Sequence, residues 1–407
     1  MQSKDSVKAF AFFAMILVLA HGAWAAPKFK LVHAFGQGQD GAGTWGSLIL
    51  DAKGNVYGTT TGGGLYTYGT VFELTPTGSG GWGETILYSF KKDGQDGCVS
   101  TAGLTFDASG SLYGTSQGCG AYGYGTVFEL THESDGWAES VIHDFSGPPN
   151  GARPYGGVVI GQGGNLFGTA GIAFELMPGS GGWTERVIDS FSRHDDGNSP
   201  FAGLIQDASG NLYGTTEYGG KQNAGIVYEL HPTTDGGWKE RILYSFCQAG
   251  PPCVDGGGPG LGALAMDQSG NLYGTTIAGG TNFCFGTCGA IFKLTRDSNG
   301  HWKESVLYDF KSGSTGFGPG ASVVRDVAGN LYGTTVYGGS AQCGCGVVYK
   351  LSPRKNGKWK YTVLHTFIGS DGAQPDANLV LDNKGNLYGT AATGGTYGYG
   401  VVFEVTP

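Results

Sequence analysis

The chain has 407 residues, of which 40% are hydrophobic and 13% aromatic, which is ample for a packed core. Its 79 glycines follow no collagen-like triplet and are interleaved with runs of Val, Tyr, Phe, Thr and Leu, so short strands joined by glycine turns are indicated. A formal net charge of −9 with scattered Lys and Arg argues against nucleic acid or an anionic membrane surface as a partner.

The first residues have the pattern of a secretory signal peptide. Two lysines, at positions 4 and 8, precede an apolar run over residues 9–20, and an Ala-Trp-Ala sequence ending at residue 25 offers a cleavage site. The apolar run is shorter than the roughly 20 residues that span a bilayer. We expect residues 1–25 to be a signal peptide, and the mature protein to be secreted, or to reside in the periplasm or cell envelope, without a membrane span.

The mature chain consists of seven copies of one unit. The motif Gly-Asn-Leu-Tyr-Gly-Thr recurs with little change, and its aromatic residues lie 46 to 60 residues apart. These aromatic residues are Tyr57, Tyr113, Phe167, Tyr213, Tyr273, Tyr332 and Tyr388. A period of this length is typical of propeller blades, and it lies somewhat above the roughly 40 to 50 residues of common blade types.

Each unit contains four strand-like runs, which the second copy shows most clearly. They cover residues 103–107, 111–115, 125–130 and 137–145, and within them apolar and polar residues tend to alternate. No window outside the signal segment has a helical stripe, and glycine is unfavourable in helices. We therefore expect the mature chain to be almost entirely β.

An aspartate precedes a glycine by three positions in the turn between the first two strands of six units. An Asp side chain can cap the backbone of such a turn, and the glycine can adopt positive φ. Calcium is the alternative, but one carboxylate per turn is too few for a cation that takes 6 to 8 oxygen ligands. We expect turn capping by Asp51, Asp107, Asp207, Asp267, Asp326 and Asp382.

The last unit lacks its fourth strand, and the missing strand is present at the other end of the chain. Residues 28–35 match the ends of fourth strands such as residues 87–90 and 364–367. One leading strand, seven sets of three and six further strands make seven blades of four. We predict an all-β, seven-bladed β-propeller over residues 26–407, a single domain with four antiparallel strands per blade. The N-terminal strand would pair in the last blade and close the ring, leaving only short edges.

These units resemble the Gloeobacter/Verrucomicrobia-type tandem repeat, with its Gly-Asn-Leu-Tyr-Gly-Thr-Thr, Gly-Gly and Gly-x-Val-Phe-Glu-Leu signatures. The resemblance covers residues 31–407. It implies an exported bacterial protein and supplies no catalytic residues. The third unit departs from the pattern because residues 167–174 lack the Gly-Gly-x-Tyr-Gly loop, so we expect a lower wall on that side of the ring.

Strand direction places the loop after each second strand and the loop between blades on one face, and function is often carried by loops on a rigid scaffold. All eight cysteines map to these loops, where an oxidising compartment favours disulfides over a metal site. Cys98 with Cys119 is the pair that we expect most strongly. Cys247 with Cys253 and Cys284 with Cys288 are local pairs, although Cys253 with Cys284 competes, and Cys343 with Cys345 would make a strained ring.

The same loops carry many tyrosines, whose apolar ring and polar tip suit contact with sugars, peptides or proteins. The alternative is that these rings only cover glycine-rich loops and pack on neighbouring blades. The candidate ligand-binding residues are Tyr66, Tyr68, Tyr122, Tyr124, Tyr218, Tyr337, Tyr397 and Tyr399.

No catalytic residue, metal site or cofactor is predicted, because no nucleophile elbow, His-Glu-x-x-His helix or phosphate loop is present. Charged residues at one repeated strand position, such as Glu73 and Glu129, are expected to be structural. The leading hypothesis is a monomeric binding module, not an enzyme, that holds a glycan or an extracellular protein on its loop-rich face. The alternatives are a carbohydrate-active enzyme (glycoside hydrolase or lyase), which needs two carboxylates about 5 to 10 Å apart, and a purely structural surface protein. Residues that break the repeat symmetry would be the better site candidates.

Overall fold

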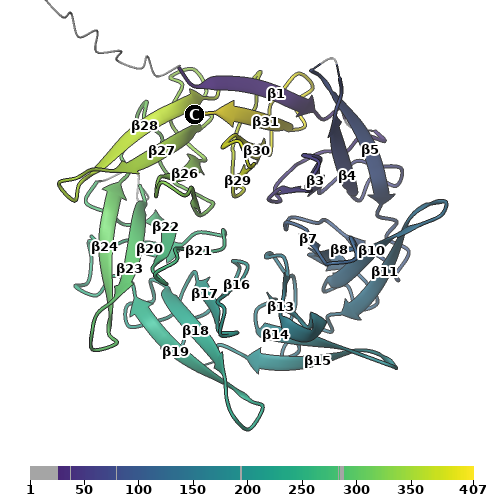
Figure 1. Cartoon of the computed structure of the whole chain (residues 1–407), viewed down its shortest axis with the longest axis horizontal. Helices are drawn as coiled ribbons and strands as arrows, with labels where there is room; N and C mark the ends of the chain where they lie inside the picture. Colours follow the sequence, from purple (N-terminus) through teal and green to yellow (C-terminus); the bar gives the residue numbers. More distant parts are fainter. Residues whose placement is uncertain (1–25, 37, 79, 193–194, 283, 285–287) are drawn as a thin grey trace, which may run out of the picture.

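Seven antiparallel sheets stand around a central axis like the blades of a propeller in the computed structural model (Figure 1). The structure describes residues 26–36, 38–78, 80–192, 195–282, 284 and 288–407. The predicted signal peptide, residues 1–25, lies outside them. Within the described ranges no helix is long and apolar enough to cross a membrane.

Each blade runs from a short strand at the axis to a long strand at the rim. The innermost strands are β2 (Ile49–Leu50), β7 (Thr105–Phe106), β12 (Val159–Ile160), β16 (Ile205–Gln206), β21 (Ala265–Met266), β25 (Val324–Arg325) and β29 (Val380–Leu381). The second strands are β3 (Val56–Thr59), β8 (Leu112–Ser116), β13 (Leu166–Thr169), β17 (Leu212–Thr216), β22 (Leu272–Ala278), β26 (Leu331–Thr335) and β30 (Leu387–Ala391).

The two outer layers hold the longer strands. The third strands are β4 (Thr70–Pro76), β10 (Thr126–Glu133), β14 (Ala173–Gly179), β18 (Ile226–Pro232), β23 (Ala290–Arg296), β27 (Val347–Pro353) and β31 (Val401–Thr406). The outermost are β5 (Trp82–Ser89), β11 (Gly136–Asp144), β15 (Gly182–Asp189), β19 (Trp238–Ser245), β24 (Trp302–Asp309), β28 (Trp359–Thr366) and β1 (Lys28–Ala34). Three short strands and a 3-10 turn are added in loops: β6 (Gly97–Cys98), β9 (Gly118–Cys119), β20 (Gly257–Pro259) and Gln162–Gly164.

The predicted ring closure is confirmed. β1 is the outermost strand of the last blade and pairs antiparallel with β31, with Leu31 opposite Phe403 (Figure 1). The first blade is also joined to the last, because the Thr44 hydroxyl donates to the carbonyl of Ala391 at 3.1 Å. The two ends of the described chain are thus held in one sheet.

Pairs of aromatic rings join neighbouring blades. One ring stands just after an outermost strand and its partner on the third strand of the next blade, and their centroids lie 4.9–5.4 Å apart. The pairs are Phe35–Phe72, Phe90–Phe128, Phe145–Phe174, Phe191–Tyr228, Phe246–Phe292, Phe310–Tyr349 and Phe367–Phe403. Tilted and edge-to-face contacts of this kind stabilise buried aromatic rings.

The glycine of the repeated Leu-Tyr-Gly-Thr motif makes room for these rings. A Cβ at Gly114 would lie 2.4 Å from the Phe128 ring, and one at Gly274 would lie 2.5 Å from the Phe292 ring. Such distances are far below van der Waals contact. The motif recurs because each second strand must let an aromatic ring lie flat against its backbone.

The turn aspartates are caps, as predicted. Asp207 accepts the backbone N–H of Ser209 and Asn211 with one oxygen, and its other oxygen accepts the Asn211 amide and the Tyr213 hydroxyl. These bonds lower the pKa of Asp207 against the effect of its burial. Its carboxylate oxygens are therefore already engaged in the turn.

Carboxyl groups also line the seams between blades. Tyr88 donates to Asp96 at 2.9 Å and Tyr244 donates to Asp255 at 2.7 Å. In each seam a glutamate from the next blade, Glu139 or Glu304, stands near the aspartate. Burial, and next the negative charge of that aspartate, raise the pKa of Glu139 and of Glu304 to about 8.

Phe29 offers a test of ring closure by side-chain packing. Its ring stacks on His365 with centroids 3.7 Å apart and also contacts Phe403. Phe29→Ala should lower the free energy of unfolding by about 2 kcal/mol, since a partly buried ring is lost. Lys28→Ala, an exposed change in the same strand, is the control in chemical denaturation. Equal stability of the two variants would contradict the packing of β1 against the last two blades.

The seam glutamates predict an unusual pH dependence. Their folded-state pKa lies above the ordinary value of 4.5, so the folded protein holds protons that the unfolded chain has released. The free energy of unfolding should therefore fall as the pH rises from 6.5 to 8.5, by at most about 1.4 kcal/mol per pH unit for each group. The lowered pKa of His143 and His365 acts only below pH 6.5.

Denaturation of the wild type and of the Glu139→Gln/Glu304→Gln double variant across this range provides the measurement. Glutamine mimics the protonated acid, so the double variant should show a flatter profile. A wild type whose stability is constant or rises between pH 6.5 and 8.5 would contradict this account.

Candidate functional site

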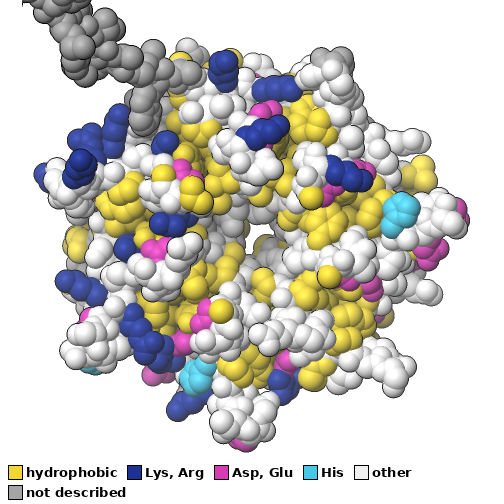
Figure 2. All heavy atoms as spheres, in the orientation of Figure 1, with side chains coloured by type: hydrophobic (Ala, Val, Ile, Leu, Met, Phe, Trp, Pro, Cys, Tyr) yellow, Lys and Arg dark blue, Asp and Glu magenta, His cyan; other side chains and the backbone are white. Residues whose placement is uncertain are grey.

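The loops between blades meet the loops after second strands at one mouth of the axial channel. A cavity of about 550 Å³ lies there. Trp45 and Thr101 come from loops between blades, whereas Thr61 and Gln117 follow second strands. Figure 2 shows hydrophobic side chains around the central opening of the disc. The two loop families thus converge at the axis, as the strand directions predict.

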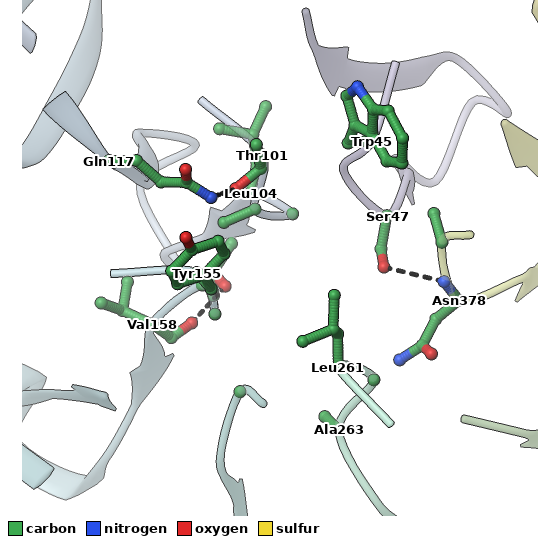
Figure 3. Close-up of a pocket in the computed structure, with 18 of the residues that line it drawn as sticks. Trp45, Ser47, Thr101, Leu104, Gln117, Tyr155, Val158, Leu261, Ala263 and Asn378 are labelled. Carbon is green, nitrogen blue, oxygen red and sulfur yellow. Dashed lines mark hydrogen bonds between the residues drawn. The ribbon is translucent and has the colours of Figure 1, made fainter. Parts of the chain in front are cut away.

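Aromatic and amide side chains line the cavity, with Tyr155 and Gln117 on one side and Trp45 beside Ser47 on the other (Figure 3). The Trp45 side chain is 38% exposed, although it belongs to a largely buried loop. Tyr155 packs against Phe201 with ring centroids 4.8 Å apart, and Gln117 donates its amide N–H to the Thr101 hydroxyl. These contacts fix the orientation of the groups that a ligand would meet.

Hydrogen bonds between blades hold the opposite side. The Ser47 hydroxyl accepts the backbone N–H of Asn378 at 3.2 Å (Figure 3). The Asn378 side-chain oxygen in turn accepts the N–H of Ser322 at 2.9 Å. The first, seventh and sixth blades are therefore joined side by side at the channel.

Asp376 is an acidic residue at a loop position where other blades carry Trp45, Thr101, Tyr155, Phe201 and Gly320. Its Oδ1 atom is shielded from solvent and has no hydrogen-bond partner among the described residues. Burial raises the pKa of Asp376 to about 6. A buried carboxyl oxygen without a partner is unfavourable unless a ligand or water bonds it.

The neighbouring blade makes space for this carboxyl group. A Cβ at Gly320 would lie 1.4 Å from Asp376 Oδ1, so no other residue could stand at position 320 without displacing the acid. Asp376 also lines a second cavity of about 370 Å³, together with Leu261, Glu217 and Tyr337. Since Leu261 and Asp376 border both cavities, the two hollows adjoin at this acid.

The tyrosines predicted from the sequence stand farther out on the loops. Tyr337 lines the second cavity and covers Gly318. The other seven line neither cavity. Several are well exposed, such as Tyr122 and Tyr397 at 62%, while Tyr124 covers Gly147 and Tyr68 lies under the Lys92 ammonium group. Their part in binding stays a prediction, and the structure does not bring them together.

All eight cysteines form disulfides in these loops. Cys98–Cys119 is confirmed, and the pairing in the middle of the chain is resolved in favour of the local bonds over Cys253–Cys284. The bonds are Cys98–Cys119, Cys247–Cys253, Cys284–Cys288 and Cys343–Cys345. Cys98–Cys119 joins a loop between blades to the loop after a second strand, whereas each of the other three bonds closes a short segment of a single loop.

The repeated in-strand charges are structural, as expected. Glu73 accepts a hydrogen bond from the Tyr57 hydroxyl at 2.7 Å and Glu129 one from Tyr113 at 2.8 Å. In two other blades a lysine takes this position and lies over the ring of the same tyrosine, as Lys293 does over Tyr273. Paired in this way, these charges are part of the sheets and do not converge on the channel.

The sequence analysis missed Trp45, Tyr155 and Asp376. A signal for Tyr155 and Asp376 exists in the repeats, because Tyr155, Phe201, Gly320 and Asp376 each follow a proline in the same loop. Aligning these four copies at that proline exposes the one acid among aromatic and small residues.

A solved structure shows a similar architecture. An ancestral GH74 enzyme is 10% identical over 89% of this chain with a TM-score of 0.54, and the match covers 47% of that enzyme. At this identity the likeness concerns the fold alone. A protein of unknown function from Dyadobacter fermentans DSM 18053 is 10% identical, covering 93% of this chain and 98% of that protein, and its TM-score of 0.44 is too low to support a conclusion about the fold. No curated protein matches the chain.

The repeat family is shown by the sequence itself. The model of the Gloeobacter/Verrucomicrobia repeat matches residues 23–173, 81–287 and 170–403, which together cover almost the whole propeller. The chain belongs to the Gloeobacter/Verrucomicrobia repeat family.

Proposed function

We propose that this propeller is an exported binding module that holds a neutral saccharide at the mouth of its central channel. The observation that carries the proposal is Asp376, an acid that lines both cavities and whose Oδ1 has no hydrogen-bond partner among the described residues. Sugar hydroxyls donate hydrogen bonds that its carboxylate group can accept, and charge-assisted bonds of this kind are strong.

The remaining lining supports the same class of ligand. Trp45 and Tyr155 offer ring faces to the apolar side of a sugar, and Gln117 adds an amide. Neither Lys nor Arg is among the residues that line the two cavities, which disfavours a phosphorylated or sulfated ligand. The volume of about 550 Å³ suits a small molecule or a few sugar rings better than a protein surface.

Export is supported by the disulfide bonds as well as by the signal-like N-terminus. Four disulfides occur in the described chain, and such bonds persist in oxidising compartments such as the periplasm or the medium.

A carbohydrate-active enzyme is the second candidate, because the second cavity is lined by two carboxyl groups, Glu217 and Asp376. Burial raises the pKa of Asp376 to about 6, so one acid of the pair is partly protonated near neutral pH. Such a pair suits acid catalysis of glycoside cleavage. The test is the release of reducing ends from oligosaccharides. Activity in the wild type that is abolished by Glu217→Gln and also by Asp376→Asn would favour this candidate over simple binding.

Saccharide binding can be tested by a glycan array followed by titration calorimetry. Trp45→Ala and Asp376→Asn should each weaken binding by about tenfold or more, since a loss of 1.4 kcal/mol corresponds to tenfold. Tyr122→Ala removes an exposed loop tyrosine that lines neither cavity and should leave the affinity unchanged. Binding lost in Tyr122→Ala but kept in Trp45→Ala would place the site on the outer loops and overturn the proposal.

The affinity should also depend on pH. Hydroxyl donors favour the ionised carboxyl, so binding should strengthen as the pH rises from 5 to 7 with a midpoint near the Asp376 pKa of about 6. The Asp376→Asn variant should show no such midpoint. A wild-type affinity that is constant across this range would show that Asp376 does not accept a bond from the ligand.

A further inference from the structure

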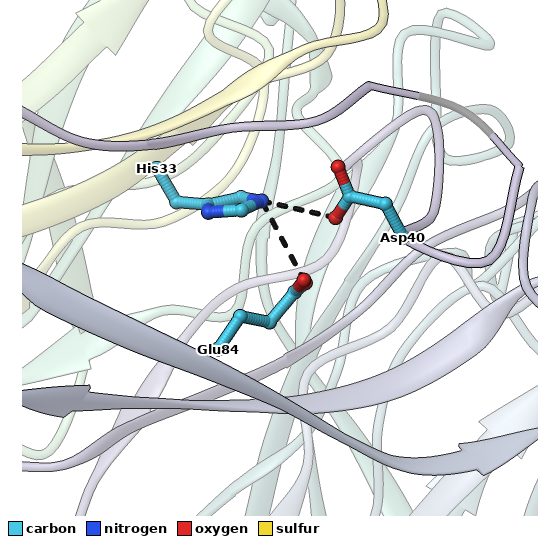
Figure 4. Close-up of side chains that lie close together, drawn as sticks. All are labelled: His33, Asp40 and Glu84. Atoms are coloured by element: carbon cyan, nitrogen blue, oxygen red, sulfur yellow. Dashed lines mark hydrogen bonds and ion pairs between the residues drawn. The ribbon is translucent and has the colours of Figure 1, made fainter.

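A histidine, an aspartate and a glutamate meet where the ring closes. His33 lies on β1, Asp40 in the loop that follows it, and Glu84 on β5 of the first blade (Figure 4). His33 Nε2 is 3.0 Å from Asp40 Oδ1 and 3.6 Å from Glu84 Oε1. One atom from each residue lies within 4.8 Å of the other two, so the three side chains surround a common point.

These separations fit a small divalent metal ion. Zinc binds imidazole nitrogen and carboxylate oxygen at about 2.0–2.2 Å, so neighbouring ligands of a tetrahedral site stand about 3.3 Å apart. The two separations from His33 Nε2 lie on either side of that value. Three protein ligands of this kind leave a fourth position for water.

The orientation of two of the three side chains is already set. The second oxygen of Asp40 accepts the backbone N–H of Gly36, which directs Oδ1 towards His33. The His33 ring packs against Phe35 with centroids 4.6 Å apart. The His33, Asp40 and Glu84 side chains are 21%, 23% and 17% exposed, so the cluster lies near the surface.

Glu84 is the third potential ligand. Its Oε1 is 3.6 Å from His33 Nε2, too far for a normal hydrogen bond. The corresponding glutamates of other seams, such as Glu139 and Glu304, also have a solvent-shielded Oε1, so this feature alone is common to the seams. What sets the closing seam apart is the combination of His33, Asp40 and Glu84 within 4.8 Å of one another.

Comparison with the other seams shows what the histidine adds. Two other seams have the same arrangement with a phenol in place of the imidazole. One contains Tyr88, Asp96 and Glu139, and the other contains Tyr244, Asp255 and Glu304. A phenol serves as the hydrogen-bond donor that the aspartate needs, so structure alone does not require histidine.

Two other seams have a histidine but lack one carboxylate. His143 lies 3.5 Å from Glu185, but Asn150 takes the loop position of Asp40. His365 lies 2.9 Å from Asp371 but stacks on Phe29, which takes the strand position of Glu84. Among the described residues, the full set of three ligands is found at the closing seam.

We propose that His33, Asp40 and Glu84 bind a divalent transition-metal ion of the zinc type, which clamps the N-terminal strand to the first blade. The ion would bridge the outermost strand of the last blade, the loop leading out of it and the outermost strand of the first blade. Ring closure would then be reinforced by coordination as well as by backbone pairing. This site is separate from the channel mouth, so its test is independent of saccharide binding.

The test uses the chain without a polyhistidine tag, dialysed against a chelator and titrated with zinc chloride in a calorimeter. We expect one ion per chain and a higher melting temperature in its presence. His33→Tyr installs the residue of the other seams, keeps a donor for Asp40, and should weaken zinc binding at least about tenfold. His365→Tyr, the matched change in the incomplete seam, should bind zinc like the wild type.

Two results would overturn the proposal. One is a wild-type protein that binds no zinc at micromolar concentrations. The other is a folded His33→Tyr protein that binds zinc with unchanged affinity and stoichiometry, because the ion would then be held elsewhere. Circular dichroism of both variants establishes that each is folded before the titrations are compared.

Discussion

Backbone pairing between β1 and β31 is the constraint on which the rest of the molecule depends. Because the first described strand completes the last blade, seven separate sheets become one ring. Only in a closed ring do loops from the first and seventh blades, such as those of Ser47 and Asn378, reach each other across the channel mouth. The cavity there is therefore a property of the whole circle and of no single blade.

Residues that recur in the blades and residues that occur in one blade have different roles in this protein. The repeated ones build the ring: interblade ring pairs with their motif glycines, capping aspartates, and tyrosine–carboxyl seams. The singular ones depart from that pattern, as Asp376 does at the channel and the combination of His33, Asp40 and Glu84 does at the closing seam. In a symmetric scaffold, such departures are where ligand chemistry can be placed without loss of the common fold.

The architecture could be predicted from sequence because its determinants are local. Each strand carries its own alternation, and six of the seven turns between first and second strands carry their own aspartate and glycine. Residues 28–35 resemble a fourth strand closely enough to reveal the closure. The third blade behaves as its shortened loop implies, with β13 and β14 joined by residues 170–172 alone, whereas residues 217–225 join β17 to β18. Disulfide bonds between cysteines close in sequence could be predicted for the same reason.

The candidate site could not be predicted from local sequence in this way, because its residues are far apart in the chain. Their burial and hydrogen bonding depend on residues of other blades. Trp45 and Asp376 belong to opposite ends of the chain, and only the ring brings them to one mouth. The burial of Asp376 depends on Gly320 in another blade. The loop tyrosines show the converse: their place in the loops was predictable, but nothing in the sequence determined that seven of the eight would line neither cavity.

Hydrogen exchange of the backbone amides in the intact protein tests the central claim of a closed ring most directly. Amides of β1 that face β31 should exchange as slowly as those of the third strands and lose protection together with them as denaturant is added. Rapid exchange throughout residues 28–34, in a protein whose other blades remain protected, would contradict closure by the N-terminal strand.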